Sequence, residues 1–61
     1  MRKVVITEDI IEGEEIILSK GQVLELVSWN SAGEYTVQEI DNNTEYKMQY
    51  LVYDDEWKEL N

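Results

Sequence analysis

Apolar and polar residues alternate with a period of two along most of the chain, which is the pattern of β-strands. The clearest case is Thr44–Val52, where Tyr46, Met48 and Tyr50 share one face and charged or amide side chains occupy the other. A second strand is expected over Gln22–Trp29. Its two faces are both partly apolar, with Leu24 and Leu26 on one and with Val23, Val27 and Trp29 on the other. The periodicity predicts an all-β chain.

Three shorter apolar runs are expected to supply the remaining strands: Arg2–Thr7, Ile16–Ser19 and Glu34–Ile40. Glycines at positions 13, 21 and 33 and the cluster Asp41–Asn43 separate the runs at intervals of 8 to 12 residues. Gly and Asn tolerate the positive φ of tight turns, so Asp41–Asn43 is expected to form a hairpin. Turns at this interval are typical of a small β-barrel or sandwich.

Two acidic segments interrupt the pattern of strands. Glu8–Glu15 is expected to form a long loop. The tail Asp54–Leu60 fits either a helical turn capped by Asp54 or a last short strand that closes the barrel. The acidic start of the tail suits a helix N-terminus, so the helical turn is favoured. Trp57 and Leu60 are spaced so that both can pack back onto the barrel.

The composition excludes several kinds of chemistry. The 61 residues, expected to form a single domain over 1–61, include no His, Cys, Phe or Pro. Disulfides, Cys/His zinc sites, thiol nucleophiles and Ser-His triads are therefore absent. The acidic residues lack the spacing of a calcium-binding loop, and the glycines form no phosphate-binding motif. We expect no enzymatic activity, no cofactor and no metal.

The chain carries 14 acidic and 5 basic side chains, for a net charge of −9. Such a charge repels phosphates, so direct binding to nucleic acid or to an anionic membrane is not expected. No apolar run is long enough to span a bilayer, and the run after Met1 ends too early, at Thr7-Glu8-Asp9, for a signal peptide. A cytoplasmic location is expected. The negative charge either serves only to keep the protein soluble or attracts a basic partner.

The order of turns and core residues resembles the Src-homology-3 (SH3) family over roughly residues 4–52. The match is tightest over Glu14–Val37, and within it Glu14–Val27 is similar to the family's acidic-Glu-Leu-Ser-Phe-x-Lys-Gly-Asp pattern. The resemblance implies a diverging turn at Lys20-Gly21-Gln22, with Gly21 at positive φ and Leu18 and Leu24 in the core. The fold it implies is a small five-stranded SH3-like barrel with a short C-terminal helical turn.

Other positions match the family less well. Gly33-Glu34-Tyr35 falls where the family has Gly-Trp-Trp, Asp41–Asn43 falls at its distal turn, and Tyr50-Leu51 falls near its final Tyr-Val. Val4–Glu8 falls at the Ala-Leu-Tyr-Asp-Tyr segment but contains no Tyr, and no Pro precedes Tyr50. Proline-rich peptides are recognised by aromatic grooves, so their binding is not expected. The chain is more similar to bacterial or phage-type SH3-like barrels.

These observations predict a non-enzymatic protein-interaction module that binds a protein with a basic surface. The expected partner-binding face combines acidic and aromatic side chains: Glu12, Glu14, Glu15, Trp29, Glu34 and Tyr50. Acidic side chains steer the encounter with a basic surface, and aromatic ones anchor it. Alternatively, the acidic loop only protects a strand edge, and Trp29 packs over Tyr35 or Tyr50 in the core. Trp57 is expected in the core.

Two other functions fit the same sequence. The first is an acidic DNA mimic, of the kind a phage uses to inhibit a host nucleic-acid-binding or defence protein. It requires carboxylates in rows at phosphate-like spacing. The second is a structural subunit that joins an assembly through an exposed strand edge.

Overall fold

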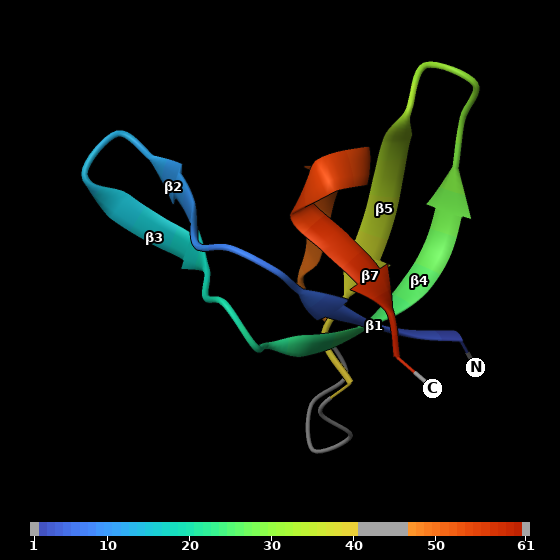
Figure 1. The fold of residues 1–61 in the computed structure, drawn as a ribbon, viewed down its shortest axis with the longest axis horizontal. Coiled ribbons are helices and arrows are strands. Elements are labelled where there is room, and N and C mark those ends of the chain that lie inside the picture. The colour runs from blue at the N-terminus through green and yellow to red at the C-terminus, as the bar shows by residue number, and fades with distance from the viewer. Residues whose placement is uncertain (1, 41–46, 61) are drawn as a thin grey trace.

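A computed structural model describes residues 2–40 and 47–60 and confirms the all-β class (Figure 1). In these residues the chain forms short strands and one 3₁₀ turn, η1. The elements are β1 (Arg2–Ile6), β2 (Ile10–Glu12), β3 (Glu15–Leu18), β4 (Val23–Trp29), β5 (Glu34–Gln38), β6 (Gln49–Tyr53), η1 (Asp54–Glu56) and β7 (Trp57–Glu59). The predicted hairpin at Asp41–Asn43 lies outside the described residues, as does Tyr46.

Five strands form one antiparallel sheet in the order β6-β5-β4-β1-β7. β2 and β3 form a separate hairpin (Figure 1). The register aligns Val4 with Leu24, and Leu26 with Val37. Cross-strand partners share a face of the sheet, so these apolar residues are buried together. The buried core consists of Val4, Ile6, Leu18, Leu24, Leu26, Val37 and Val52. Leu18 is its contribution from the hairpin.

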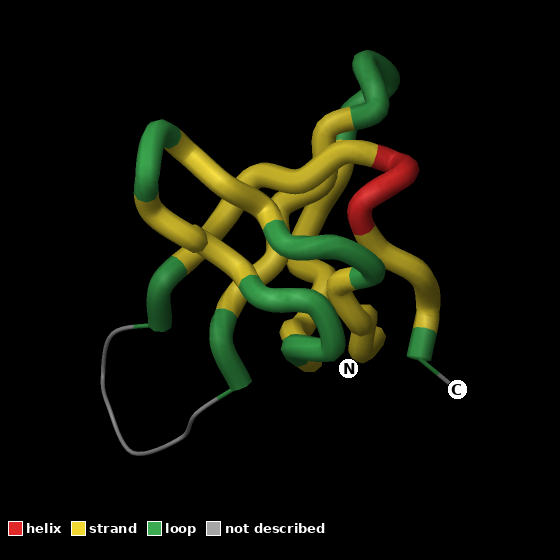
Figure 2. The backbone as a smooth tube through the Cα atoms, turned by 60° about the vertical axis from the view of Figure 1, so that its left-hand side comes forward, coloured by secondary structure: helices red, strands yellow, loops and turns green. Residues whose placement is uncertain are grey.

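The sheet does not close into the barrel that the sequence predicts. Only Asp54–Glu56 separates β6 from β7, so the two opposite edges approach each other at this end (Figure 2). Within the described residues, however, no ladder joins β6 to β7. The backbone groups at this end already have other hydrogen-bond partners. The N–H of Tyr53 donates to a Glu56 carboxylate oxygen at 2.8 Å, and the Glu56 C=O accepts from the N–H of Thr7 at 2.9 Å. The result is a coiled but open sheet.

The C-terminal tail contains both of the elements weighed for it. The favoured helical turn is present as η1, and a short strand, β7, follows and pairs with β1. The predicted cap is wrong, because Tyr53 and not Asp54 is the N-cap residue. Asp54 lies inside the first turn, where a negative charge suits the free N–H groups.

A β-bulge at Val27 changes the face on which Trp29 lies. Strict alternation groups Trp29 with Val23 and Val27, but the register between β4 and β5 shifts between Leu26 and Ser28. After the shift Trp29 pairs with Tyr35, and so lies on the side of the sheet that carries the core.

The acidic segment Glu8–Glu15 is not the open loop that was expected. Ile10–Glu12 forms β2, which pairs with β3 across a turn in which Gly13 has a φ of +64°. The second predicted turn is confirmed: Gly21 has a φ of +91°, and its N–H donates to the C=O of Ile6 at 2.7 Å. Both turns use a conformation that favours glycine.

Candidate interaction groove

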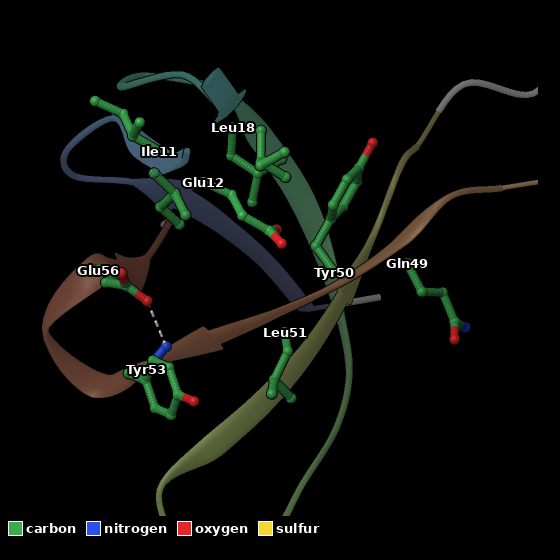
Figure 3. Close-up of a pocket in the computed structure, with 10 residues that line it drawn as sticks. Ile11, Glu12, Leu18, Gln49, Tyr50, Leu51, Tyr53 and Glu56 are labelled. Carbon is green, nitrogen blue, oxygen red and sulfur yellow. Dashed lines mark hydrogen bonds between the residues drawn. The ribbon is translucent and has the colours of Figure 1, made fainter. Parts of the chain in front are cut away.

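A groove of about 470 Å³ lies between the β2–β3 hairpin and β6 (Figure 3). Its volume is in the range of ligand-binding pockets, and its lining as a whole is more apolar than polar. The hairpin contributes Ile10, Ile11, Glu12, Ile17 and Leu18, and the opposite wall consists of Gln49, Tyr50, Leu51, Tyr53 and Glu56. The groove follows one edge of the five-stranded sheet, because β6 is the outermost strand on that side.

Several large apolar side chains of the two walls are exposed close together. Ile11 is 60% exposed, Leu51 51% and Tyr53 50%. Leu51 and Tyr53 flank the buried Val52, so alternation along β6 directs them away from the core. Clustered exposed apolar side chains mark surfaces that bind other molecules.

The hairpin wall is held to the sheet at its base. The backbone N–H of Lys20 donates to a carboxylate oxygen of Asp9 at 2.7 Å, which ties the chain before β2 to the chain after β3. Ile10 pairs with Leu18, and Leu18 is buried in the core. The hairpin is therefore anchored through Leu18 while Ile11 and Glu12 remain at the surface.

Among the described residues, the groove lining includes two carboxylates and no cation. Glu12 extends from the hairpin toward the β6 side, and Glu56 stands at the end of β6, bonded to the N–H of Tyr53 (Figure 3). Burial, and then the negative charge of Glu39, raise the pKa of Tyr50, so its phenol stays neutral and able to donate a hydrogen bond. Each wall of the groove therefore combines apolar or aromatic side chains with one carboxylate.

The structure brings only part of the predicted binding face to this groove. Glu12 and Tyr50 line it, from opposite walls. Glu14 and Glu15 lie on the same hairpin, exposed and outside the lining, with Glu15 paired to Glu12. The acidic and aromatic groups that sequence reasoning selected do meet here, but through one residue of each kind.

Trp29 and Glu34 lie outside the groove lining, at the end of β4 and the start of β5, although Glu34 pairs with the groove residue Tyr53. Trp29 is 57% exposed, and the guanidinium of Arg2 lies 5.2 Å from the centroid of its ring. Glu34 is half-buried and accepts a hydrogen bond from the side-chain amide of Asn30 at 2.9 Å. Trp57 is partly buried against the core and meets Tyr35 edge-on, with ring centroids 4.9 Å apart.

Ile11, Leu51, Tyr53 and Glu56 are groove residues that sequence reasoning missed. Leu51 and Tyr53 follow the alternation around Val52, so their exposure could have been predicted. Their position on an edge strand could not, because strand order depends on pairings between distant segments. Glu56 gave no signal beyond its place in an acidic run.

A second, smaller hollow of about 250 Å³ carries the opposite charge. It is lined by Val5, Ile6, Thr7, Lys20, Gly21 and Lys58. Both lysines are exposed; Lys20 lies in the turn after β3, and Lys58 lies in β7. Lys20 and Lys58 therefore lie outside the lining of the acidic groove.

Comparison of the chain with models of protein families, with curated proteins and with solved structures found no match. The part of the chain that the structure describes contains no helix long and apolar enough to cross a membrane. Over the same residues, no three carboxylates lie together as a metal site would require.

Proposed function

We propose that this chain is a non-enzymatic protein-interaction module whose acidic and aromatic groove binds a basic, partly apolar segment of a protein partner. The observation that carries the proposal is the groove itself: its lining is more apolar than polar, each wall carries one carboxylate, Glu12 or Glu56, and no cation lines it in the part of the chain that the structure describes. Apolar contact supplies affinity at such a site, and the surrounding charge steers a basic partner toward it. The net charge of −9 extends that steering over the whole surface.

We also propose that the fold is SH3-like, of the bacterial or phage type. A five-stranded coiled sheet, the positive φ of Gly21 and a hairpin in the place of the family's first long loop support this relation. The departures from the family at Val4–Glu8 and Glu34 argue against proline-rich ligands. A cytoplasmic location remains part of the same proposal.

Capture of partners tests the function first. The full chain is immobilised, exposed to lysate at low salt and eluted with a salt gradient, and the released proteins are identified by mass spectrometry. Affinity for each purified candidate is then measured by calorimetry. A true partner is expected to bind more weakly as salt rises, since charge steers the encounter. Displacement of the partner by duplex DNA would instead favour the DNA-mimic alternative.

Two matched pairs of variants then locate the site. Ile11→Ser changes the groove, whereas Ile16→Ser changes its exposed cross-strand partner outside the lining. Glu12→Gln removes a groove charge, whereas Glu14→Gln removes an equal charge from the same hairpin. We expect a loss of affinity of about fivefold or more for Ile11→Ser and about two- to fivefold for Glu12→Gln. Equal effects within each pair would show that the partner binds elsewhere.

A further inference from the structure

β6 is an edge strand, and its outer side borders the groove. Its inner side pairs with β5 along its whole length, from Gln49 opposite Gln38 to Tyr53 opposite Glu34. Among the described residues no strand pairs with the outer side. Such an edge is a template for one more strand, because its outward backbone N–H and C=O groups have no ladder partner.

The hydrogen bonds show which residues face outward. The N–H of Glu39 donates to the C=O of Met48 at 3.1 Å, so the backbone of Met48 points to the β5 side. Backbone direction alternates along an antiparallel strand, so Tyr50 and Val52 also point to β5. Gln49, Leu51 and Tyr53 therefore point outward. In agreement, the N–H of Tyr53 bonds to the Glu56 carboxylate and not to β5.

We propose that the groove binds its partner by β-strand addition, with an extended basic and apolar segment pairing through its backbone with Gln49 and Leu51 on the outer edge of β6. The proposal rests on the proposed function and adds the conformation of the ligand and the atoms that bind it. Side chains on the two faces of the added strand contact Tyr50 and Ile17 on one side, and Leu51 and Tyr53 on the other.

The charges select the occupant. A second copy of the chain would bring a further net charge of −9 against Glu12 and Glu56, which like-charge repulsion opposes. A segment that carries Lys or Arg is attracted by the same two carboxylates. The edge therefore favours a foreign basic strand over self-association.

Glu56 also limits how far the added strand can extend. Because its carboxylate already binds the N–H of Tyr53, pairing of that N–H with a ligand is blocked at the end of β6. The five residues of β6 span about 17 Å at roughly 3.4 Å per residue, so the paired part of the ligand is short. A peptide of about seven residues is long enough to cover it.

The test uses the full chain labelled with ¹⁵N and a seven-residue capped peptide in which Lys and Val alternate. Amide hydrogen exchange is followed by NMR with and without saturating peptide. We expect exchange at Gln49 and Leu51 to slow by about tenfold or more, because their N–H groups become bonded. The amide of Tyr53, already bonded, should change much less. A peptide with Glu in place of Lys is the charge control and should not bind.

Backbone methylation of the peptide tests the pairing without altering the protein. In a strand, all Val N–H groups point one way and all Lys N–H groups point the other. Methylation of the set that faces β6 should weaken binding by about tenfold or more, and methylation of the other set should change it far less. A basic proline-rich peptide, which lacks most N–H donors, should bind more weakly than the Lys-Val peptide.

The outcomes separate this inference from the proposed function. If the peptide binds without slowing exchange at Gln49 and Leu51, and both methylated peptides bind equally well, strand addition is wrong. If Glu12→Gln still weakens binding in that case, the proposed function stands. Tighter binding of the proline-rich peptide would overturn strand addition as well. Protection of Leu51 that grows with protein concentration in the absence of peptide would assign the edge to a second copy. Failure of every basic peptide, with no effect of Glu12→Gln on any partner, would overturn both.

Discussion

Arg2 holds Glu59 through two hydrogen bonds, from Nε to Oε2 at 3.0 Å and from Nη2 to Oε1 at 2.7 Å. The pair joins the first strand to the last, which lie next to each other in the sheet. The same guanidinium lies over the ring of Trp29. One arginine therefore connects three strands at the end of the molecule away from the groove.

Arg2→Lys is expected to lower the melting temperature slightly, by less than about 5 °C. Lysine keeps the charge but cannot form the planar two-bond contact with a carboxylate or stack on Trp29 in the same way. The effect is small because both side chains of the pair are about half exposed. Thermal unfolding followed by circular dichroism measures it. Lys3→Arg, a conservative exchange at the next position, is the control, and an equal decrease there would show that the contact is irrelevant.

The contribution of Glu59 should depend on pH. The hydrogen bonds from Arg2, and secondarily its charge, lower the pKa of Glu59 below its ordinary value of 4.5. A carboxyl whose pKa is lower in the folded state stabilises the fold above the unfolded pKa, and this stabilisation is lost as pH falls through the folded pKa. Glu59→Gln should therefore be less stable than the parent protein at neutral pH, with a difference that shrinks as the pH falls below the ordinary pKa of the carboxyl. A difference that is constant across this range in urea unfolding would contradict the assignment.

Most of the strands could be predicted from the sequence because their alternation is local. Leu24 and Leu26 lie in the core and Val23 and Val27 at the surface, as their spacing indicates. The prediction failed where the outcome depends on pairing between distant segments. The bulge at Val27, which turns Trp29 to the other face, is a property of the β4–β5 register and leaves no mark in the alternation of β4.

The candidate site was harder to predict than the fold for the same reason. Glu12 was selected as an acidic residue that steers a basic partner and Tyr50 as an aromatic anchor, and the two line one groove. Trp29 was selected on the same ground, but the strand order separates it from the groove by β5 and β6. That order also makes β6 an edge.

Leu24→Ala should leave little folded protein at room temperature. Leu24 is fully buried, and removing a buried leucine side chain costs about 2–5 kcal/mol. The core of a chain this short rarely supplies more than about 3–5 kcal/mol of stability. Val27→Ala, at a half-exposed position of the same strand, should change stability by about 0.5 kcal/mol or less. Comparable losses for both variants in thermal unfolding would mean that the core is not where the structure places it.

Gly21→Ala should destabilise the fold through backbone conformation alone. The φ of Gly21 is +91°, and an added Cβ would meet no atom within 4 Å. The expected cost is about 1–2 kcal/mol, which is the penalty of the left-handed region for a residue with a Cβ. Gly21→Asn should cost less, since asparagine tolerates this region better although it is larger. If steric contact were the cause, asparagine would be the worse of the two in urea unfolding.

The two tryptophans should differ in fluorescence quenching, with Trp29 the more accessible to solvent. In the variant Trp57→Phe the emission comes from Trp29, which is 57% exposed at the end of β4. In Trp29→Phe it comes from Trp57, which packs on the core with its ring nitrogen buried. Acrylamide is the appropriate quencher because it is neutral and the protein is strongly acidic.

We expect the emission of Trp29 to be quenched several times more steeply than that of Trp57, and to lie at longer wavelength. Trp29 lies outside the groove, so saturation with the Lys-Val peptide should leave its quenching unchanged. If the peptide strongly protects Trp29 from quenching, Trp29 belongs to the binding face, as the sequence predicts. The interface would then lie at the end of β4 and not at the edge of β6. Equal quenching of the two tryptophans without peptide would contradict the placement of Trp57 against Tyr35.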